Sequence, residues 1–375
     1  MDRGEQKGLI ERIARRIATG TTDECEAPVA ESAEDFLSPE RFEKERERLF
    51  LDSPQVIGFA GEVAQPGSFV AREAMGVPIL VTRDRGGRLH AFLNACGHRG
   101  ARLAEGHGRA SGGRLVCRFH AWSYGLDGRL ASRPSAASFD AADAGCDLVR
   151  LPVSDRSGLL VVGLRPSVSQ GAVDDHLVEI EAQLAGLGLE RAQTLDERRY
   201  DVAASWKLVS MLSYESYHFA SLHRDTVATM FEANAIADVF GRHSRWAFAL
   251  KGTDKLLEQD PSAWPDHFPG ALSFQLFPGT VLITTWEIAQ LIRSEPGARP
   301  GESVVHVVGG YFDAAKREVL QANYDLGRVA FEQEDLPAAV ESQRGIALRG
   351  GRFFVGRNEP IVAFWLGQWR DALRD

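Results

Sequence analysis

Long apolar stretches are missing from this chain of 375 residues, and so are dense clusters of cysteine or of positive charge. No apolar run approaches the ~20 residues that span a bilayer, so we expect no membrane-spanning helix. Four cysteines are too few and too scattered for a disulfide framework, which favours a reducing, cytoplasmic setting. A net charge of −9 without a basic run argues against nucleic acid as a partner.

Nucleotide-binding motifs are also absent. The sequence has neither a glycine fingerprint between a strand and a helix nor a phosphate-binding loop, so we expect no NAD(P)H site in this chain. The 44% of hydrophobic residues is ample for a buried core, and the length suits two or three domains.

Two short motifs dominate what is present: Cys96-x-His98 and Cys117-x-x-His120, with eighteen residues between them. Each motif offers one thiolate and one imidazole, which together indicate a metal site. Zinc sites usually pair Cys with Cys and His with His. The mixed pairs suit a [2Fe–2S] cluster with two cysteines on one iron and two histidines on the other. A structural zinc site or scattered core residues are the alternatives.

The flanks of these motifs carry a family resemblance. The segments NACGHRGARL and CRFHAWSYGLDGRL resemble the Rieske domain of ring-hydroxylating oxygenase α subunits. The gap between the motifs is a residue or so longer than is usual there, and we expect the extra length in a hairpin tip at residues 106–113. The resemblance implies a [2Fe–2S] cluster, a mononuclear Fe(II), and electrons from NAD(P)H through a separate reductase or ferredoxin.

A second constellation lies about a hundred residues downstream, at Glu215, His218 and His223. The two histidines are five residues apart, which is about 140° around a regular α-helix. A π-bulge, or a helix that ends between them, would bring both imidazoles to one metal. Two imidazoles and one carboxylate form the facial triad of non-haem iron oxygenases. Taken alone, the pattern is weak, and two core or surface histidines explain it better.

The resemblance extends to this constellation. The order Ser205-Trp206-Lys207, Glu215, His218, His223 is similar to the family pattern NWK…E-x-x-H-x-x-x-x-H, with Ser205 in place of Asn. Where the family often has Glu-Asn, this chain has Met211 and Leu212, which makes the wall of the expected site more apolar.

The third ligand implied by the resemblance is the Asp of a Glu-Asp pair followed eight residues later by Gln-Arg-Gly. Asp335 stands at that distance from Gln343, so we expect Asp335 to bind the mononuclear iron with His218 and His223. The alternative is that Glu332, Glu334 and Asp335 are only a solvated helix start, since acids are favoured there.

Glu215 occupies the position of an acid that, in the family, does not bind metal. It links a Rieske histidine of one subunit to a metal-ligand histidine of the next. Family members that act on quaternary ammonium compounds also have Glu at this position. Six aromatic residues of the second half could form a cage for such a cation or could be core residues: Trp246, Trp264, Phe274, Phe277, Trp286 and Tyr311.

The predicted fold class is α+β, with a small antiparallel β Rieske domain and a catalytic domain of antiparallel sheet covered by helices. We place a helical lead-in at residues 1–50, the Rieske domain at 51–165 and the catalytic iron domain at 166–375. An amphipathic helix near the N-terminus is expected to dock on the protein, with a membrane-surface helix as the alternative. The resemblance implies a homotrimer and leaves open whether a β subunit joins.

The expected function is an O2-dependent oxygenase that hydroxylates or oxidatively dealkylates a small organic substrate, aromatic or quaternary ammonium. Two rival functions are weighed against it. A Rieske electron-transfer protein with a ligand-binding domain would have no mononuclear iron, and a zinc hydrolase would need no redox cluster.

Overall fold

The computed structural model describes residues 1–139 and 145–374. The chain divides into two compact units. The first, called the sheet-and-helix unit here, contains Met1–Arg46, Glu179–Leu187 and Thr194–Asp375. The second, called the β unit, contains Glu47–Val178 and Gly188–Gln193.

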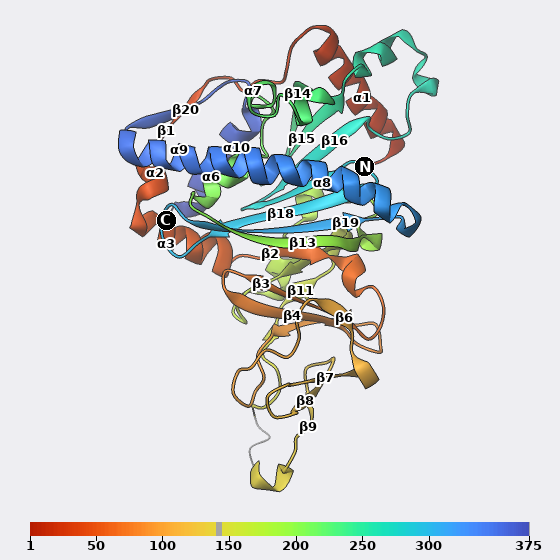
Figure 1. The fold of residues 1–375 in the computed structure, drawn as a ribbon, viewed down its shortest axis with the longest axis vertical. Helices are drawn as coiled ribbons and strands as arrows, with labels where there is room; N and C mark the ends of the chain where they lie inside the picture. Colours follow the sequence, from red (N-terminus) through yellow and green to blue (C-terminus); the bar gives the residue numbers. More distant parts are fainter. Residues whose placement is uncertain (140–144, 375) are drawn as a thin grey trace. The chain divides into compact units, whose positions relative to one another are not determined.

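Short strands build the β unit (Figure 1). Ser68–Ala74 shows why, since every second side chain is buried, as in a strand with one face on a core. A five-stranded sheet has the order β10-β5-β4-β3-β6, and two three-stranded sheets have the orders β11-β12-β2 and β7-β8-β9. The bounds are β2 Gln55–Phe59, β3 Ser68–Ala74, β4 Val77–Arg83, β5 Leu89–Leu93, β6 His107–Arg109, β7 Arg114–Val116, β8 Ser123–Gly125, β9 Leu130–Ser132, β10 Arg150–Leu151, β11 Val153–Ser154 and β12 Leu159–Val162.

The segment between the two Cys/His motifs differs from the predicted hairpin tip at residues 106–113. Strand β6 pairs with β3, where Val70 lies opposite His107, whereas β7 pairs with β8. The extra length therefore carries the chain from one sheet to another. Both cysteines of the motifs lie in the core that the two sheets share, beside Phe92, Trp122 and Tyr124.

A seven-stranded sheet forms the centre of the sheet-and-helix unit, in the order β13-β19-β18-β17-β16-β15-β14. The neighbouring strands from β14 to β19 pair antiparallel. The bounds are β13 Gln193–Val202, β14 Phe231–Phe240, β15 His243–Leu250, β16 Gly270–Leu276, β17 Thr280–Thr284, β18 Ile288–Pro296 and β19 Ser303–Tyr311. A separate pair joins β1 Val29–Ser32 to β20 Arg352–Val355.

Helices cover this sheet (Figure 1). They are α1 Arg3–Ala18, α2 Glu34–Leu37, α3 Pro39–Glu45, α6 Trp206–Met211, α7 Phe219–Leu222, α8 Arg317–Ala330, α9 Leu336–Arg349 and α10 Pro360–Leu373. Helix α1 buries Leu9, Ile10 and Ile13 against the unit, as the docked amphipathic helix predicts. Within the described residues, no helix is long and apolar enough to cross a membrane.

Helix α8, the π-helical turn Phe331–Asp335 and α9 follow one another as one rod (Figure 1). From the sequence alone, residues 314–331 are predicted as a helix and residues 335–345 as its continuation, and the structure has this rod there. Helical periodicity also predicts a helix at residues 174–184, where the structure has only the short pieces α4 Gln170–Asp175 and α5 Glu181–Leu184. The predicted α+β fold class is confirmed.

Candidate active site

Three side chains that the sequence placed together do converge in the sheet-and-helix unit. The ligand atoms of His218, His223 and Asp335 lie within 4.8 Å of one another. His218 caps the start of α7 and His223 its end, and His223 has left helical geometry, with φ −99° and ψ 25°. A helix that ends at the second histidine is therefore what brings the two imidazoles together.

Both imidazoles turn the same nitrogen toward Asp335. Nε2 of His223 lies 3.0 Å from Oδ1 of Asp335, and Nε2 of His218 lies 3.7 Å from it. The other nitrogen of each ring meets a second carboxylate. Nδ1 of His223 lies 2.7 Å from Oε2 of Glu334, and Nδ1 of His218 bonds to Oε1 of Glu215. A carboxylate at Nδ1 holds the proton there and leaves the Nε2 lone pair free to bind a metal.

Asp335 has the character of a metal ligand. Its Oδ1 is buried and lies against Nε2 of both histidines. Burial works against the charged form of His223, but Asp335 and Glu334 outweigh it, so that the pKa of His223 is raised. Two imidazole nitrogens and one buried carboxylate oxygen this close together fit a divalent cation.

The π-helical turn explains how two adjacent acids reach the same histidine. Glu334 and Asp335 end the turn Phe331–Asp335, immediately before α9 begins at Leu336. Such wide turns cluster at functional sites. Glu334 also accepts a hydrogen bond of 2.7 Å from Oγ1 of Thr226, which fixes its carboxylate against His223.

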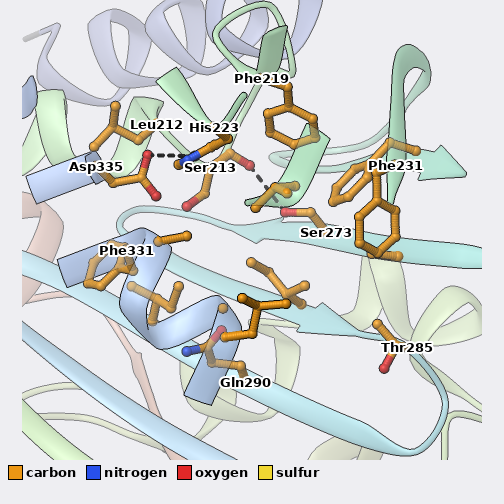
Figure 2. Close-up of a pocket in the computed structure, with 18 of the residues that line it drawn as sticks. Leu212, Ser213, Phe219, His223, Phe231, Ser273, Thr285, Gln290, Phe331 and Asp335 are labelled. Carbon is orange, nitrogen blue, oxygen red and sulfur yellow. Dashed lines mark hydrogen bonds and ion pairs between the residues drawn. The ribbon is translucent and has the colours of Figure 1, made fainter. Parts of the chain in front are cut away.

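A cavity of about 370 Å³ ends at His218, His223 and Asp335 (Figure 2). One face of the central sheet lines it, with Trp246, Ser273 and Gln290 among the contributors, and α8 lines it from the other side. Leu212, one of the two departures from the family pattern, lies in its wall. The volume falls in the range of roughly 300–1,000 Å³ typical of small-molecule sites.

Glu215 also borders a second, smaller cavity of about 160 Å³, which includes Met211 and Glu359. Burial first, and then the nearby charge of Glu215, raise the pKa of Glu359, whose carboxylate accepts a hydrogen bond from the Gly356 amide. Glu215 therefore stands between the histidine pair and a second acid.

The two Cys/His loops of the β unit share one backbone design. In the first, the Cys96 amide donates to the carbonyl of Ala101, and the Gly100 amide donates back to Cys96. In the second loop, the Cys117 amide donates to the carbonyl of Trp122, and the Ala121 amide donates to the carbonyl of Cys117. Gly100 and Ala121 have positive φ angles of 74° and 57° at equivalent positions. Two equivalent turns present matched ligand pairs.

The ligand pairs differ in exposure as a Rieske cluster requires. Cys96 and Cys117 are buried, whereas His98 and His120 reach the surface, with ring centroids 4.6 Å apart. The buried hydroxyl of Tyr124 lies 3.2 Å from Sγ of Cys96 and accepts from the Gly97 amide.

Glycine is needed between the first pair of ligands. A Cβ at Gly97 would lie 2.5 Å from the Cys146 carbonyl oxygen. These donors and contacts fit a cluster whose sulfurs are hydrogen-bonded and whose histidines are accessible.

Comparison with protein families assigns both halves of the chain. Residues 53–151 match the Rieske [2Fe-2S] domain, and residues 189–375 match the ring hydroxylating alpha subunit (catalytic domain). This chain is a Rieske oxygenase α subunit. The membership implies a [2Fe–2S] cluster and a mononuclear iron, and it confirms the resemblance seen in the sequence.

Two curated relatives are similar to this Rieske oxygenase subunit. The carnitine monooxygenase oxygenase subunit of Acinetobacter baumannii is 28% identical over 335 residues, which are 84% of this chain and 85% of the relative. The glycine betaine monooxygenase oxygenase subunit of Pseudomonas aeruginosa is 31% identical over 199 residues, 52% of this chain and 45% of the relative. The chain thus spans less than half the length of the latter.

Solved structures share the Rieske oxygenase fold. The quaternary ammonium Rieske monooxygenase CntA, in complex with an inhibitor, superposes with a TM-score of 0.76 at 22% identity, over 91% of this chain and 94% of that one. Naphthalene 1,2-dioxygenase from Rhodococcus sp., bound to indole, gives 0.73 at 17% identity over 98% of each chain.

Sequence reasoning missed two acids of this site. Glu334 was weighed only as part of a solvated helix start, and Glu359 was not considered. Of the six aromatic residues suggested for a cation cage, Trp246 alone lines the large cavity. The only sequence signal for Glu334 is its place directly before Asp335.

Proposed function

We propose that this chain is the catalytic subunit of an O2-dependent Rieske oxygenase, which hydroxylates or oxidatively dealkylates a small organic substrate. One observation carries the proposal: an apolar cavity ends at the triad His218, His223 and Asp335 in a chain that also contains paired Cys/His loops. In this assignment Cys96, His98, Cys117 and His120 hold the cluster.

The chain's own residues prepare the site for this chemistry. Glu215 and Glu334 accept from Nδ1 of the two imidazoles, so that each ring keeps its Nδ1 proton and turns Nε2 toward the metal position. The three protein ligands lie on one side of the site and leave room toward the cavity. An Fe(II) held there supplies the activation of O2, while the apolar walls exclude water.

Electrons have to reach this site from outside the chain. The proposed donor is a reductase or ferredoxin that draws on NAD(P)H, and the proposed assembly is a homotrimer, with or without a β subunit. The structure of a quaternary ammonium Rieske monooxygenase is described as giving insights into inter-subunit electron transfer in that protein. In this chain we assign Glu215 as the bridge, supported by its bond to Nδ1 of His218 and its place at the second cavity.

The domain boundaries and the cellular location belong to the same proposal. We assign residues 51–165 to the Rieske domain and 166–375 to the catalytic domain, with 1–50 as the lead-in. A cytoplasmic location is supported by the cysteines, since Cys25, Cys96, Cys117 and Cys146 form no disulfide with one another.

Metal analysis and oxygen uptake test the proposal. The purified protein should contain about three irons and two acid-labile sulfides per chain, with the EPR signal of an imidazole-ligated cluster after reduction. With a reductase present, substrate should stimulate O2 uptake. Iron in the cluster alone would favour the electron-transfer protein, and zinc without a cluster would favour the hydrolase.

A further inference from the structure

The large cavity offers a substrate very little charge. Its polar side chains away from the metal site are neutral: Ser213, Ser273, Thr285, Gln290, Asn323 and Tyr324. No lysine or arginine is among the described residues that line it. The two acids that do line it, Glu215 and Asp335, both face the histidine pair.

The sheet face shows how this neutral lining arises. Trp246 lies opposite Ser273, Ser273 opposite Ile283, and Ile283 opposite Gln290, so that one row of paired residues crosses four strands. The hydroxyl of Ser273 donates a hydrogen bond of 3.2 Å to the carbonyl oxygen of Ser213 (Figure 2). The row therefore presents apolar surface, the amide of Gln290 and the indole of Trp246, whose N–H has no hydrogen-bond partner in the structure.

A carboxylate in the part of the cavity away from the metal site would find no lysine or arginine as a partner among the described lining residues. An ionised carboxyl group buried without a charge partner or several hydrogen bonds is strongly destabilised. Carnitine and glycine betaine, named as substrates of the relatives, both carry such a group.

The cavity also offers a quaternary ammonium group few favourable contacts. Glu215 and Asp335 are the acids among the described lining residues, and both already pair with a histidine, so a cation would find no free carboxylate in the walls. Phe219, Phe231 and Phe248 do line the cavity, but they pack edge to face on one another. Their ring centroids are 5.2 Å apart in both contacts, at interplanar angles of 85° and 74°.

We propose that this cavity takes an uncharged, largely apolar substrate whose one hydrogen-bonding group meets the amide of Gln290. The inference rests on the proposed oxygenase function and names its substrate class. It separates this chain from the relatives whose names specify charged substrates.

Two probes of equal shape test the charge. 4-tert-Butylphenol and (4-hydroxyphenyl)trimethylammonium differ only in replacing a neutral carbon by a cationic nitrogen. Their affinities for the anaerobic holoprotein are measured by calorimetry, with L-carnitine and glycine betaine in parallel. We expect the phenol to bind at least about ten-fold more tightly than the cation, and the zwitterions not to bind. Equal or tighter binding of the cation, or no binding of the phenol, overturns the proposal.

A charge placed in the cavity should reverse the preference. Gln290→Glu is expected to strengthen binding of the cationic probe and weaken that of the phenol, so that their affinity ratio falls at least ten-fold. Gln259→Glu makes the same charge change on an exposed residue outside the cavity and should leave the ratio unchanged. An unchanged ratio in Gln290→Glu means that the probes bind elsewhere and overturns the proposal.

A second variant tests the same cavity in case Gln290→Glu does not fold. Gly327 lines the cavity from α8, and a Cβ there meets nothing within 4 Å. Gly327→Leu improves helix propensity and should weaken phenol binding by filling space. Gly8→Leu, at an equally open helical glycine outside the cavity, is the control. If Gly327→Leu folds and binds the phenol as the native protein does, the cavity is not the site.

These outcomes separate the two proposals. A protein that binds the phenol but lacks mononuclear iron retains the inferred ligand class and loses the oxygenase function. A protein that consumes O2 with choline or carnitine but rejects the phenol retains the oxygenase function and loses the inferred class.

Discussion

Glu334 lies 2.7 Å from Nδ1 of His223, on the nitrogen that does not face Asp335. Two consecutive carboxylates thus serve the two nitrogens of one imidazole. One is placed to share a metal with the ring and the other to orient the ring.

Removing this orienting carboxylate should weaken metal binding. We expect Glu334→Ala to lower the affinity for Fe(II) by about 10–100-fold, the range measured for groups that orient metal ligands. Titration of Fe(II) or Co(II) into protein stripped of mononuclear metal measures it. Glu332→Ala is the matched control, because Glu332 bonds to Tyr200 and Arg328 and to neither histidine. Equal affinities in both variants would contradict the orienting role.

Loss of a histidine should remove one metal centre and spare the other. His223→Ala, and likewise His218→Ala, should lose the mononuclear iron and substrate-stimulated O2 uptake while the cluster absorbance remains. The reason is that the triad and the Cys/His loops belong to separate compact units. Iron counting together with the visible spectrum decides it. Full activity of His223→Ala would refute the triad.

The bridge role of Glu215 predicts a different phenotype. Glu215→Gln should retain both metal centres but slow the oxidation of a pre-reduced cluster during a single turnover. Glutamine has one acceptor end and one donor end, so it cannot accept from two imidazoles as a carboxylate does. Glu215→Asp keeps the charge and should be milder. Rapid-mixing absorbance follows the cluster, and a native rate in Glu215→Gln would defeat the assignment.

The hydroxyl of Tyr124 should tune the cluster. It lies 3.2 Å from Sγ of Cys96, and a hydrogen bond to a ligand sulfur favours the reduced, more negative cluster. One such bond, worth about 1 kcal/mol, corresponds to roughly 40 mV for a one-electron couple. Tyr124→Phe should lower the reduction potential by about that amount, measured by redox titration. An unchanged potential with an intact cluster would show that this contact carries no such bond.

A buried ion pair should matter for stability. Lys207 pairs with Glu45, which also accepts hydrogen bonds from the indoles of Trp206 and Trp369. Burial lowers the pKa of Lys207 despite the nearby carboxylate of Glu45. Lys207→Met leaves Glu45 without its cation and should cost about 3–5 kcal/mol of unfolding free energy.

An exposed ion pair provides the comparison in the same unit. Lys316 and Glu287 are 2.7 Å apart, with 56% and 51% of their side chains exposed. Lys316→Met should therefore change stability by no more than about 1 kcal/mol. Denaturant unfolding of both variants tests the difference, and equal losses would contradict it.

Local patterns predicted much of this molecule. Short runs between glycine turns predict strands such as one at residues 67–71, which the structure has as part of β3. The pair Ser38-Pro39 predicts the capped start of a helix, and in α3 Oγ of Ser38 accepts from the Arg41 amide. The resemblance to the family's order of residues predicted that His218, His223 and Asp335 lie together, although more than a hundred residues separate Asp335 from the histidines.

The direction in which individual side chains point could not be predicted from the sequence. Whether Glu334 points to solvent or to His223 depends on the geometry of one helical turn, which residue types do not specify. The same holds for the aromatic residues: Phe274 and Trp246 lie on strands of one sheet, yet of the two Trp246 alone faces the cavity, because strand neighbours alternate between faces.

The π-helical turn Phe331–Asp335 stands between α8, which walls the cavity, and α9. Each residue of a regular helix advances the direction of its side chain by about 100°. Deleting one residue here would straighten the rod and rotate the metal ligand away from the face that carries Tyr324 and Gly327. The number of residues between α8 and Asp335 is therefore fixed by the direction in which the Asp335 side chain has to point. Changes of substrate preference at this wall have to arise by exchanging side chains along α8, because a one-residue insertion or deletion between α8 and Asp335 would turn the proposed metal ligand away from the cavity.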